Sequence, residues 1–273
     1  MRKAIFIILV TSVCFTSRLL AIPADSLLIE KYGMVKIHSS DIGVYYARPK
    51  DKATIVQLDS FLTTKATDLF KEFKHQIEGQ VRFEFYPSIN ASQCVCEWDT
   101  LGKKERNWDK LGCAHYIKKI QMVIPGTSIV GDSIYNIWGG FYKVMLHEYI
   151  HSVTYDIVGE ENINKIPWWI SEGLACWKAD QYHYGKGFKK LILEKIDQNE
   201  VPTAKELHTD YLNVDLLYGW SWLFCDYIIQ TYGWNRMLDI QSNFKDFKTI
   251  MGKNYKKITI EWLEYLKTKP VDE

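Results

Sequence analysis

The chain has 273 residues, of which 47% are hydrophobic, 14% aromatic and 25% charged. This composition excludes a disordered or collagen-like protein, and the length predicts one large domain or two small ones. The 34 basic and 33 acidic side chains give a net charge of +1, so the chain lacks the excess of positive charge that is typical of nucleic-acid-binding proteins. We therefore expect no nucleic-acid partner, while the oligomeric state stays open.

Residues 1–21 are predicted to form a secretory signal peptide. A basic start at Arg2 and Lys3 is followed by an apolar run over residues 4–15 and then by small side chains such as Ala21, which is the order of segments in such signals. The apolar run is shorter than the ~20 residues that cross a bilayer. We expect the mature chain to be secreted, periplasmic or held at the cell envelope, with no membrane span. Whether it is released or retained stays open.

The first half of the chain mixes predicted strands with a predicted helix. Residues 41–47 and 117–124 are rich in β-branched and aromatic or apolar side chains, as is typical of strands. Alternation over residues 81–86 (VRFEFY) predicts a third strand that is half-buried. Apolar side chains near helical spacing predict an amphipathic helix over residues 55–77.

Residues 88–114 are polar and contain a cluster of cysteines, which predicts a long loop or insertion. The cluster consists of Cys94, Cys96 and Cys113. In an oxidising compartment Cys113 could form a disulfide with either of the other two. A zinc knuckle is the alternative, although the usual Cys-x-x-Cys pair is missing. The pairing stays open.

From residue 140 onward the pattern is helical almost to the end of the chain. Because strands and helices come first and only helices follow, we expect an α+β fold with a mixed α/β lobe over residues 22–139 and a mainly helical lobe over residues 140–273. Cys176 and Cys225 lie in apolar patterns and are predicted to be buried thiols. The predicted helices span residues 140–158, 169–182, 186–197, 215–231, 234–248 and 257–268.

The first of these helices carries a metal-binding pattern. His147 and His151 are separated by four positions, so their imidazoles project from the same helical face and can both reach one Zn²⁺. Glu148 follows the first histidine directly and can reach a water molecule at that ion, where it can act as a general base. Two histidines at this spacing also occur by chance on a buried helix, so a third ligand is needed.

Glu172 is the candidate for this third ligand. It follows His151 by 21 positions, after a loop that contains Gly159 and Pro167, and it lies near the start of the next predicted helix, with Ser171 as a possible cap. A helix that returns antiparallel could direct the carboxylate toward the two imidazoles. Two histidines and one glutamate leave the fourth tetrahedral position open, which is the pattern of a catalytic zinc site.

These two segments resemble the gluzincin metallopeptidases, especially the peptidase MA-like proteins. The resemblance rests on His-Glu-x-x-His at 147–151 and on Pro-Trp-Trp-Ile-Ser-Glu-Gly-Leu-Ala at 167–175. It implies one Zn²⁺ per chain, held by His147, His151 and Glu172, with Glu148 as the base. It also implies a single catalytic domain over residues 22–273 with a zincin-like fold, in which the active-site helix lies between the lobes.

The resemblance extends, less specifically, over about residues 40–268. The predicted strand 117–124 is similar to the edge strand that binds an extended peptide in these enzymes. Tyr218 lies in a helix similar to the one that carries their oxyanion-binding tyrosine, with His208 and Tyr211 as alternatives. Residues 258–266 resemble their closing helix.

Two departures from the pattern of these enzymes affect the expected chemistry. Cys176 stands where thermolysin-like members carry an acid that orients a ligand histidine, so we expect Asp156 or Asp180 to take over that role. The Gly-x-Met-Glu-Asn motif of the related aminopeptidases is missing before the predicted helix at 140–158, which carries the two histidines and is called the metal helix below. Its absence favours cleavage inside a chain.

Together these features predict an exported zinc endopeptidase that acts on a peptide or protein. The first alternative is a catalytically inactive, zinc-stabilised module that binds peptide or a surface polymer, and the second is a binding module without metal. The substrate and the cleavage preference stay open.

Overall fold

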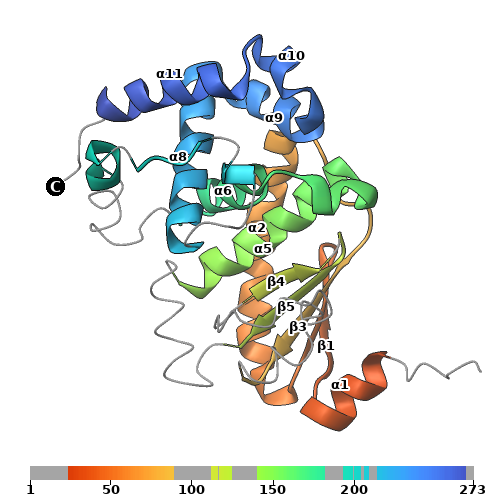
Figure 1. Cartoon of the computed structure of the whole chain (residues 1–273). Coiled ribbons are helices and arrows are strands. Elements are labelled where there is room, and N and C mark those ends of the chain that lie inside the picture. The colour runs from red at the N-terminus through yellow and green to blue at the C-terminus, as the bar shows by residue number, and fades with distance from the viewer. Residues whose placement is uncertain are drawn as a thin grey trace, which may run out of the picture.

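The computed structural model describes residues 24–88, 112–115, 117–124, 140–181, 193–198, 200–203, 206–208 and 214–268. The predicted signal peptide, Cys94 and Cys96 lie outside these residues, as does the side chain of Cys113. The described part of the chain has an α+β fold, with a sheet at one end and helices at the other (Figure 1).

In the described part of the chain, the sheet has five strands in the order β1-β2-β3-β5-β4. Its three inner strands run parallel to one another, and the two outer strands pair antiparallel with their neighbours. The predicted strands at 41–47, 81–86 and 117–124 are confirmed as β2, β3 and β5. The bounds are Val35–Ser39 for β1, Gly43–Ala47 for β2, Val81–Tyr86 for β3, Gly112–His115 for β4 and Lys119–Val123 for β5.

The prediction that residues 117–124 form the edge strand is wrong. The chain turns back between His115 and Lys119, so β4 pairs with β5, with Ala114 opposite Ile120. β5 therefore lies between β3 and β4, and β4 is the outermost of the described strands on that side of the sheet. The four residues of β4 are too few to show alternation, so the sequence pattern predicted a loop there instead of a strand.

One face of the sheet is covered by helices α2 (Lys52–Phe73) and α5 (Phe141–Val158). Alternate residues of a strand point to the same face, and on β3 this face carries Phe83 and Phe85. The Phe83 ring stacks against Tyr45 of β2 at a centroid distance of 4.8 Å and against Tyr149 of α5 at 6.4 Å. The helix predicted over residues 55–77 is confirmed as α2, although it ends earlier because Lys74 adopts a left-handed conformation with φ 53°.

The other face of β3 is also buried, so the prediction of a half-buried strand is wrong. Glu84 and Tyr86 on this face are almost fully buried. The Glu84 carboxylate accepts hydrogen bonds from the Arg82 Nε at 2.6 Å, the Tyr86 hydroxyl at 2.7 Å and the Gln121 amide at 2.8 Å. These bonds allow polar side chains to be buried where the sequence pattern alone indicated contact with solvent.

Helix α1 lies at the sheet end of the molecule, and the other remaining helices among the described residues form the second half of the fold (Figure 1). The predicted helices at 140–158, 169–182, 215–231 and 257–268 are confirmed as α5, α6, α8 and α11. Of the one predicted at 186–197, residues 193–197 are helical and residues 186–192 lie outside the described ranges. The bounds are Ala24–Tyr32 for α1, Trp168–Lys178 for α6, Val214–Tyr232 for α8, Trp234–Ser242 for α9, Phe247–Met251 for α10 and Tyr255–Thr268 for α11.

The helix predicted over residues 234–248 is interrupted. Asn243 leaves the helical conformation at φ −134° and ψ 47°, and it separates α9 from a short 3₁₀ turn and α10. The Asn243 carbonyl accepts a hydrogen bond from the Asp246 N–H, which starts this turn. A short polar residue of this kind favours turns over helix interiors.

Among the described residues, the larger of two apolar clusters connects the sheet to the helical half. At its centre α6 crosses α8 so closely that a Cβ added at Gly173 would lie 2.4 Å from the Ser221 carbonyl oxygen. Beside this crossing the fully buried ring of Trp169 packs edge-on against Phe224, which in turn packs against Trp262 of α11. Helix α6 is thereby held firmly against α8.

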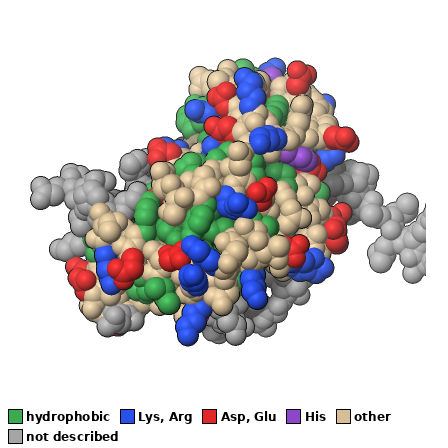
Figure 2. Space-filling model, turned by 90° about the horizontal axis from the view of Figure 1, so that it is seen from above, with side chains coloured by type: hydrophobic (Ala, Val, Ile, Leu, Met, Phe, Trp, Pro, Cys, Tyr) green, Lys and Arg blue, Asp and Glu red, His purple; other side chains and the backbone are tan. Residues whose placement is uncertain are grey.

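Figure 2 shows basic and acidic side chains interspersed over one face of the molecule. Among the described helices, none is both long enough and apolar enough to cross a membrane.

Candidate metal centre

Helix α5 brings His147 and His151 onto one face, as their spacing predicts. Their rings lie one turn apart with centroids separated by 4.6 Å. The helix starts after Gly140, at φ 99°, and ends before Gly159, at φ 81°. It runs through the interior, so both imidazoles and the neighbouring Glu148 are buried.

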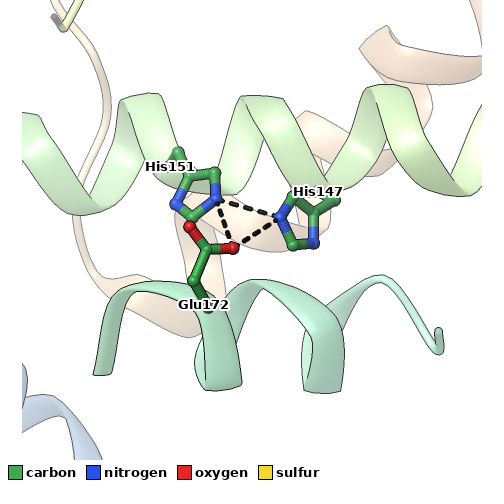
Figure 3. A group of neighbouring side chains, drawn as sticks. All are labelled: His147, His151 and Glu172. Atoms are coloured by element: carbon green, nitrogen blue, oxygen red, sulfur yellow. Dashed lines mark hydrogen bonds and ion pairs between the residues drawn. The ribbon is translucent and has the colours of Figure 1, made fainter. Parts of the chain in front are cut away.

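Helix α6 supplies Glu172. The chain leaves α5 through the 3₁₀ turn Glu160–Lys165 and re-enters a helix after Pro167, whose carbonyl oxygen accepts the N–H groups of Ile170 and Ser171. Ser171 therefore lies inside the first turn of α6, and the prediction that it caps the helix is wrong. One residue further on, the Glu172 side chain points at the histidines of α5 (Figure 3).

The three predicted ligands converge on one point (Figure 3). The Nε2 atoms of His147 and His151 are 2.9 Å apart, and Glu172 Oε2 lies 3.1 Å from the first and 3.2 Å from the second. Ligand atoms at about 2.0–2.2 Å from a tetrahedral ion lie roughly 3.3–3.6 Å apart. The observed triangle is slightly smaller, so small side-chain movements would open it to this size. The group could therefore hold a metal ion.

The electrostatics of this group favour an ionised Glu172. Burial by itself raises the pKa of this carboxyl. The charge of His151 and the hydrogen bonds from His147 and His151 outweigh burial, so the pKa lies far below its ordinary value. The carboxylate is thus available as an anionic ligand.

The Nδ1 atoms of the two histidines point away from the triangle, toward α6. His151 Nδ1 lies 3.2 Å from Ser171 Oγ, and His147 Nδ1 lies 3.7 Å from Cys176 Sγ. Both contacts come from the helix that also carries Glu172. The sequence did not predict them, because they depend on how α6 approaches α5.

Asp156 and Asp180 do not take the role that we expected of them. Asp156 pairs with His75 of the segment after α2, at an Oδ2–Nε2 distance of 2.7 Å. Asp180 lies beyond the end of α6 with a largely exposed side chain, and its Oδ2 is 2.7 Å from the Lys143 Nζ. Neither carboxylate orients a histidine of the triangle.

Glu148 lies beside the triangle and against strand β4. Burial raises the pKa of Glu148. The charges of His147 and His151 oppose this shift and the charge of Glu172 reinforces it, so the net shift is upward. The backbone N–H of Ala114 in β4 donates a hydrogen bond to the Glu148 carboxylate. The outermost strand of the sheet therefore borders the candidate site, a contact that the sequence did not predict.

Two tyrosines line the group. Tyr218 of α8 lies with its ring centroid 6.4 Å from that of His147 and 5.8 Å from that of Trp168. Tyr155 stacks on His151 at 5.7 Å. It was not among the predicted site residues, although its position four residues after His151 places it on the same helical face. The side chain of His208 and the whole of Tyr211, the alternatives to Tyr218, lie outside the described residues.

The described residues thus bring together a group that could hold a metal ion, a buried carboxylate beside it and two tyrosines at its border. No protein-family model matches the sequence, and no curated protein matches it.

Proposed function

We propose that the protein is an exported zinc-dependent metallopeptidase of the gluzincin type, which cleaves bonds inside a peptide or protein chain. The observation that carries this proposal is the triangle of His147, His151 and Glu172 with Glu148 next to it. Two imidazoles and one carboxylate are the ligand set of hydrolytic zinc sites, in which the fourth position is left for water or substrate.

His147, His151 and Glu172 would hold the zinc ion, whose Lewis acidity would polarise a peptide carbonyl and make water a better proton donor. Glu148 takes the proton from the attacking water and passes it to the leaving amine. Its burial suits this role, because a raised pKa brings the carboxylate closer to the neutral pH at which it must both accept and release a proton. Tyr218 donates a hydrogen bond to the oxyanion that forms on the carbonyl.

The substrate is proposed to bind along β4 rather than β5. Outer strands bind extended peptides through their free N–H and C=O groups. Ala114 of β4 contacts Glu148, so a peptide added to this strand would run next to the metal helix. A zincin-like fold is part of the proposal, supported by a sheet whose outer strand is antiparallel and by a metal helix packed between that sheet and the helical half.

The test compares the wild-type mature chain with Glu148→Gln, after loading both with zinc. We expect both to bind one zinc ion per chain, because Glu148 is not a ligand. Cleavage of casein or of a quenched-fluorescence peptide library should fall by about 10²–10⁴-fold in the variant, the usual contribution of a general base. Equal activities would contradict the role of Glu148. Stoichiometric zinc without cleavage by the wild type would contradict the peptidase and favour the zinc-stabilised binding module.

A further inference from the structure

We propose that Cys176 is a positioning residue for the metal site, and that its sulfur accepts the hydrogen bond which orients His147. This inference rests on the metal-binding part of the proposed function and is independent of whether the protein cleaves peptides.

The two nitrogens of the His147 imidazole have different partners. His147 directs Nε2 to Glu172 and His151, so Nδ1 is left to carry the ring proton when Nε2 binds a metal. Ligand histidines almost always donate this N–H to an acceptor, which fixes both the tautomer and the ring orientation. The acceptor that the structure places there is Cys176 Sγ, at 3.7 Å, which is within the longer reach of hydrogen bonds to sulfur.

Helix α6 holds the Cys176 sulfur in place. Cys176 is fully buried, and it follows Glu172 by four positions, so both side chains leave the same face of α6. The same helix places Ser171 Oγ at 3.2 Å from His151 Nδ1. Helix α6 therefore carries one candidate metal ligand together with the two side chains that contact the Nδ1 atoms of the histidines.

The contact between the Cys176 sulfur and His147 is weaker than one made by a carboxylate would be. A neutral thiol is a weak acceptor, whereas a carboxylate accepts a charge-assisted bond that is about twice as strong. We therefore expect the site to bind zinc less tightly than its ligands would allow. A stronger acceptor at position 176 should raise the zinc affinity.

Zinc affinity provides the test, measured by competition with a chromogenic chelator and without any substrate. We expect Cys176→Ala to weaken zinc binding by about 10-fold, the lower end of the usual cost of losing an orienting contact, because the thiol is a weak acceptor. The matched control is Cys225→Ala: this second thiol is also fully buried, it donates to the Trp169 carbonyl at 3.2 Å, and it has no role at the histidines. The control should leave the affinity unchanged while incurring a similar cost in stability.

A spectroscopic signature separates orientation from general damage. In Co²⁺-substituted protein, the visible bands of the ion should change in Cys176→Ala and stay unchanged in Cys225→Ala. Cys176→Asp, whose carboxylate reaches further from the Cβ than the sulfur does, should bind zinc at least as tightly as the wild type.

Two results would overturn the inference. One is a Cys176→Ala protein that binds zinc as tightly as the Cys225→Ala control. The other is a folded Cys176→Asp protein that binds zinc more weakly than the wild type. Either result is compatible with an active peptidase, and an inactive protein that shows the expected affinities would disprove only the peptidase.

Discussion

Glu84 shows how a single residue can make the stability depend on pH. Burial raises the pKa of this carboxyl, but the Gln121 amide, the Lys119 charge, the Tyr86 hydroxyl and Arg82 together hold it below the ordinary value of 4.5. A carboxyl whose pKa is lower in the folded state contributes stability above its unfolded pKa, and this contribution is lost as the pH falls through the folded value.

We predict that Glu84→Gln lowers the free energy of unfolding by about 1–3 kcal/mol at pH 7, because hydrogen bonds to a charged acceptor are lost. The difference from the wild type should shrink as the pH falls from about 4.5 toward 3. Urea unfolding at pH 7, 5 and 3.5 measures it. Glu264→Gln is the control, since Glu264 is 69% exposed in its pair with Lys267 and such pairs contribute little. A difference that stays constant across this range would refute the prediction.

At the scale of elements, the crossing of α6 and α8 depends on Gly173. Alanine is favoured over glycine inside a helix by about 1 kcal/mol, which by itself predicts that Gly173→Ala stabilises the protein. The added Cβ would lie 2.4 Å from a backbone oxygen of Ser221, and backbone cannot move aside as a flexible side chain can. The clash therefore outweighs the gain in helix propensity, and the substitution is expected to lower the stability.

We predict that Gly173→Ala destabilises the fold by about 1–3 kcal/mol, as overpacking usually does, and that it weakens zinc binding because α6 must shift together with Glu172. Urea unfolding and zinc titration measure the two effects. Ser221→Ala serves as the control, since the buried Ser221 hydroxyl has no hydrogen-bond partner among the described residues, and its removal should leave stability unchanged or slightly increased. A stabilised Gly173→Ala protein would show that the crossing relaxes easily.

The sequence predicts those elements whose signal is local and periodic. β3 and α5 carry alternation or helical spacing over six or more residues, and both appear where they were expected. β4 has only four residues, and its existence depends on pairing with β5 rather than on its own pattern. The break at Asn243 likewise arises from one backbone conformation that an apolar repeat does not reveal.

The candidate site was likewise predictable from the sequence only in part. The i, i+4 spacing fixes His147 and His151 on one face whatever the rest of the fold does, and the resemblance to gluzincins indicated Glu172. The contacts of Cys176 and Ser171 with the Nδ1 atoms depend on the distance and rotation between two helices, which no spacing within one helix encodes. The prediction that Asp156 or Asp180 orients a ligand histidine was wrong for that reason.

At the scale of the whole molecule, a bound metal would join α5 to α6 and would therefore stabilise the native state. A ligand that binds only the folded form adds about 2.7 kcal/mol when its concentration is 100 times its dissociation constant. We predict that zinc raises the thermal unfolding midpoint and that EDTA reverses the rise. The double variant His147→Ala, His151→Ala should show neither effect. A wild-type midpoint that responds to neither zinc nor EDTA would favour the binding module without metal.

The 25 positions that separate His147 from Glu172 also bear on the order of folding. The loop that must close to bring α6 onto α5 is short, and contacts close in sequence form sooner than pairings between distant strands. By contrast, β2 must find β3 across the whole length of α2. We therefore expect the two helices to meet before the sheet is complete, so that an ion captured at this stage would serve as a nucleus around which the slower strands assemble.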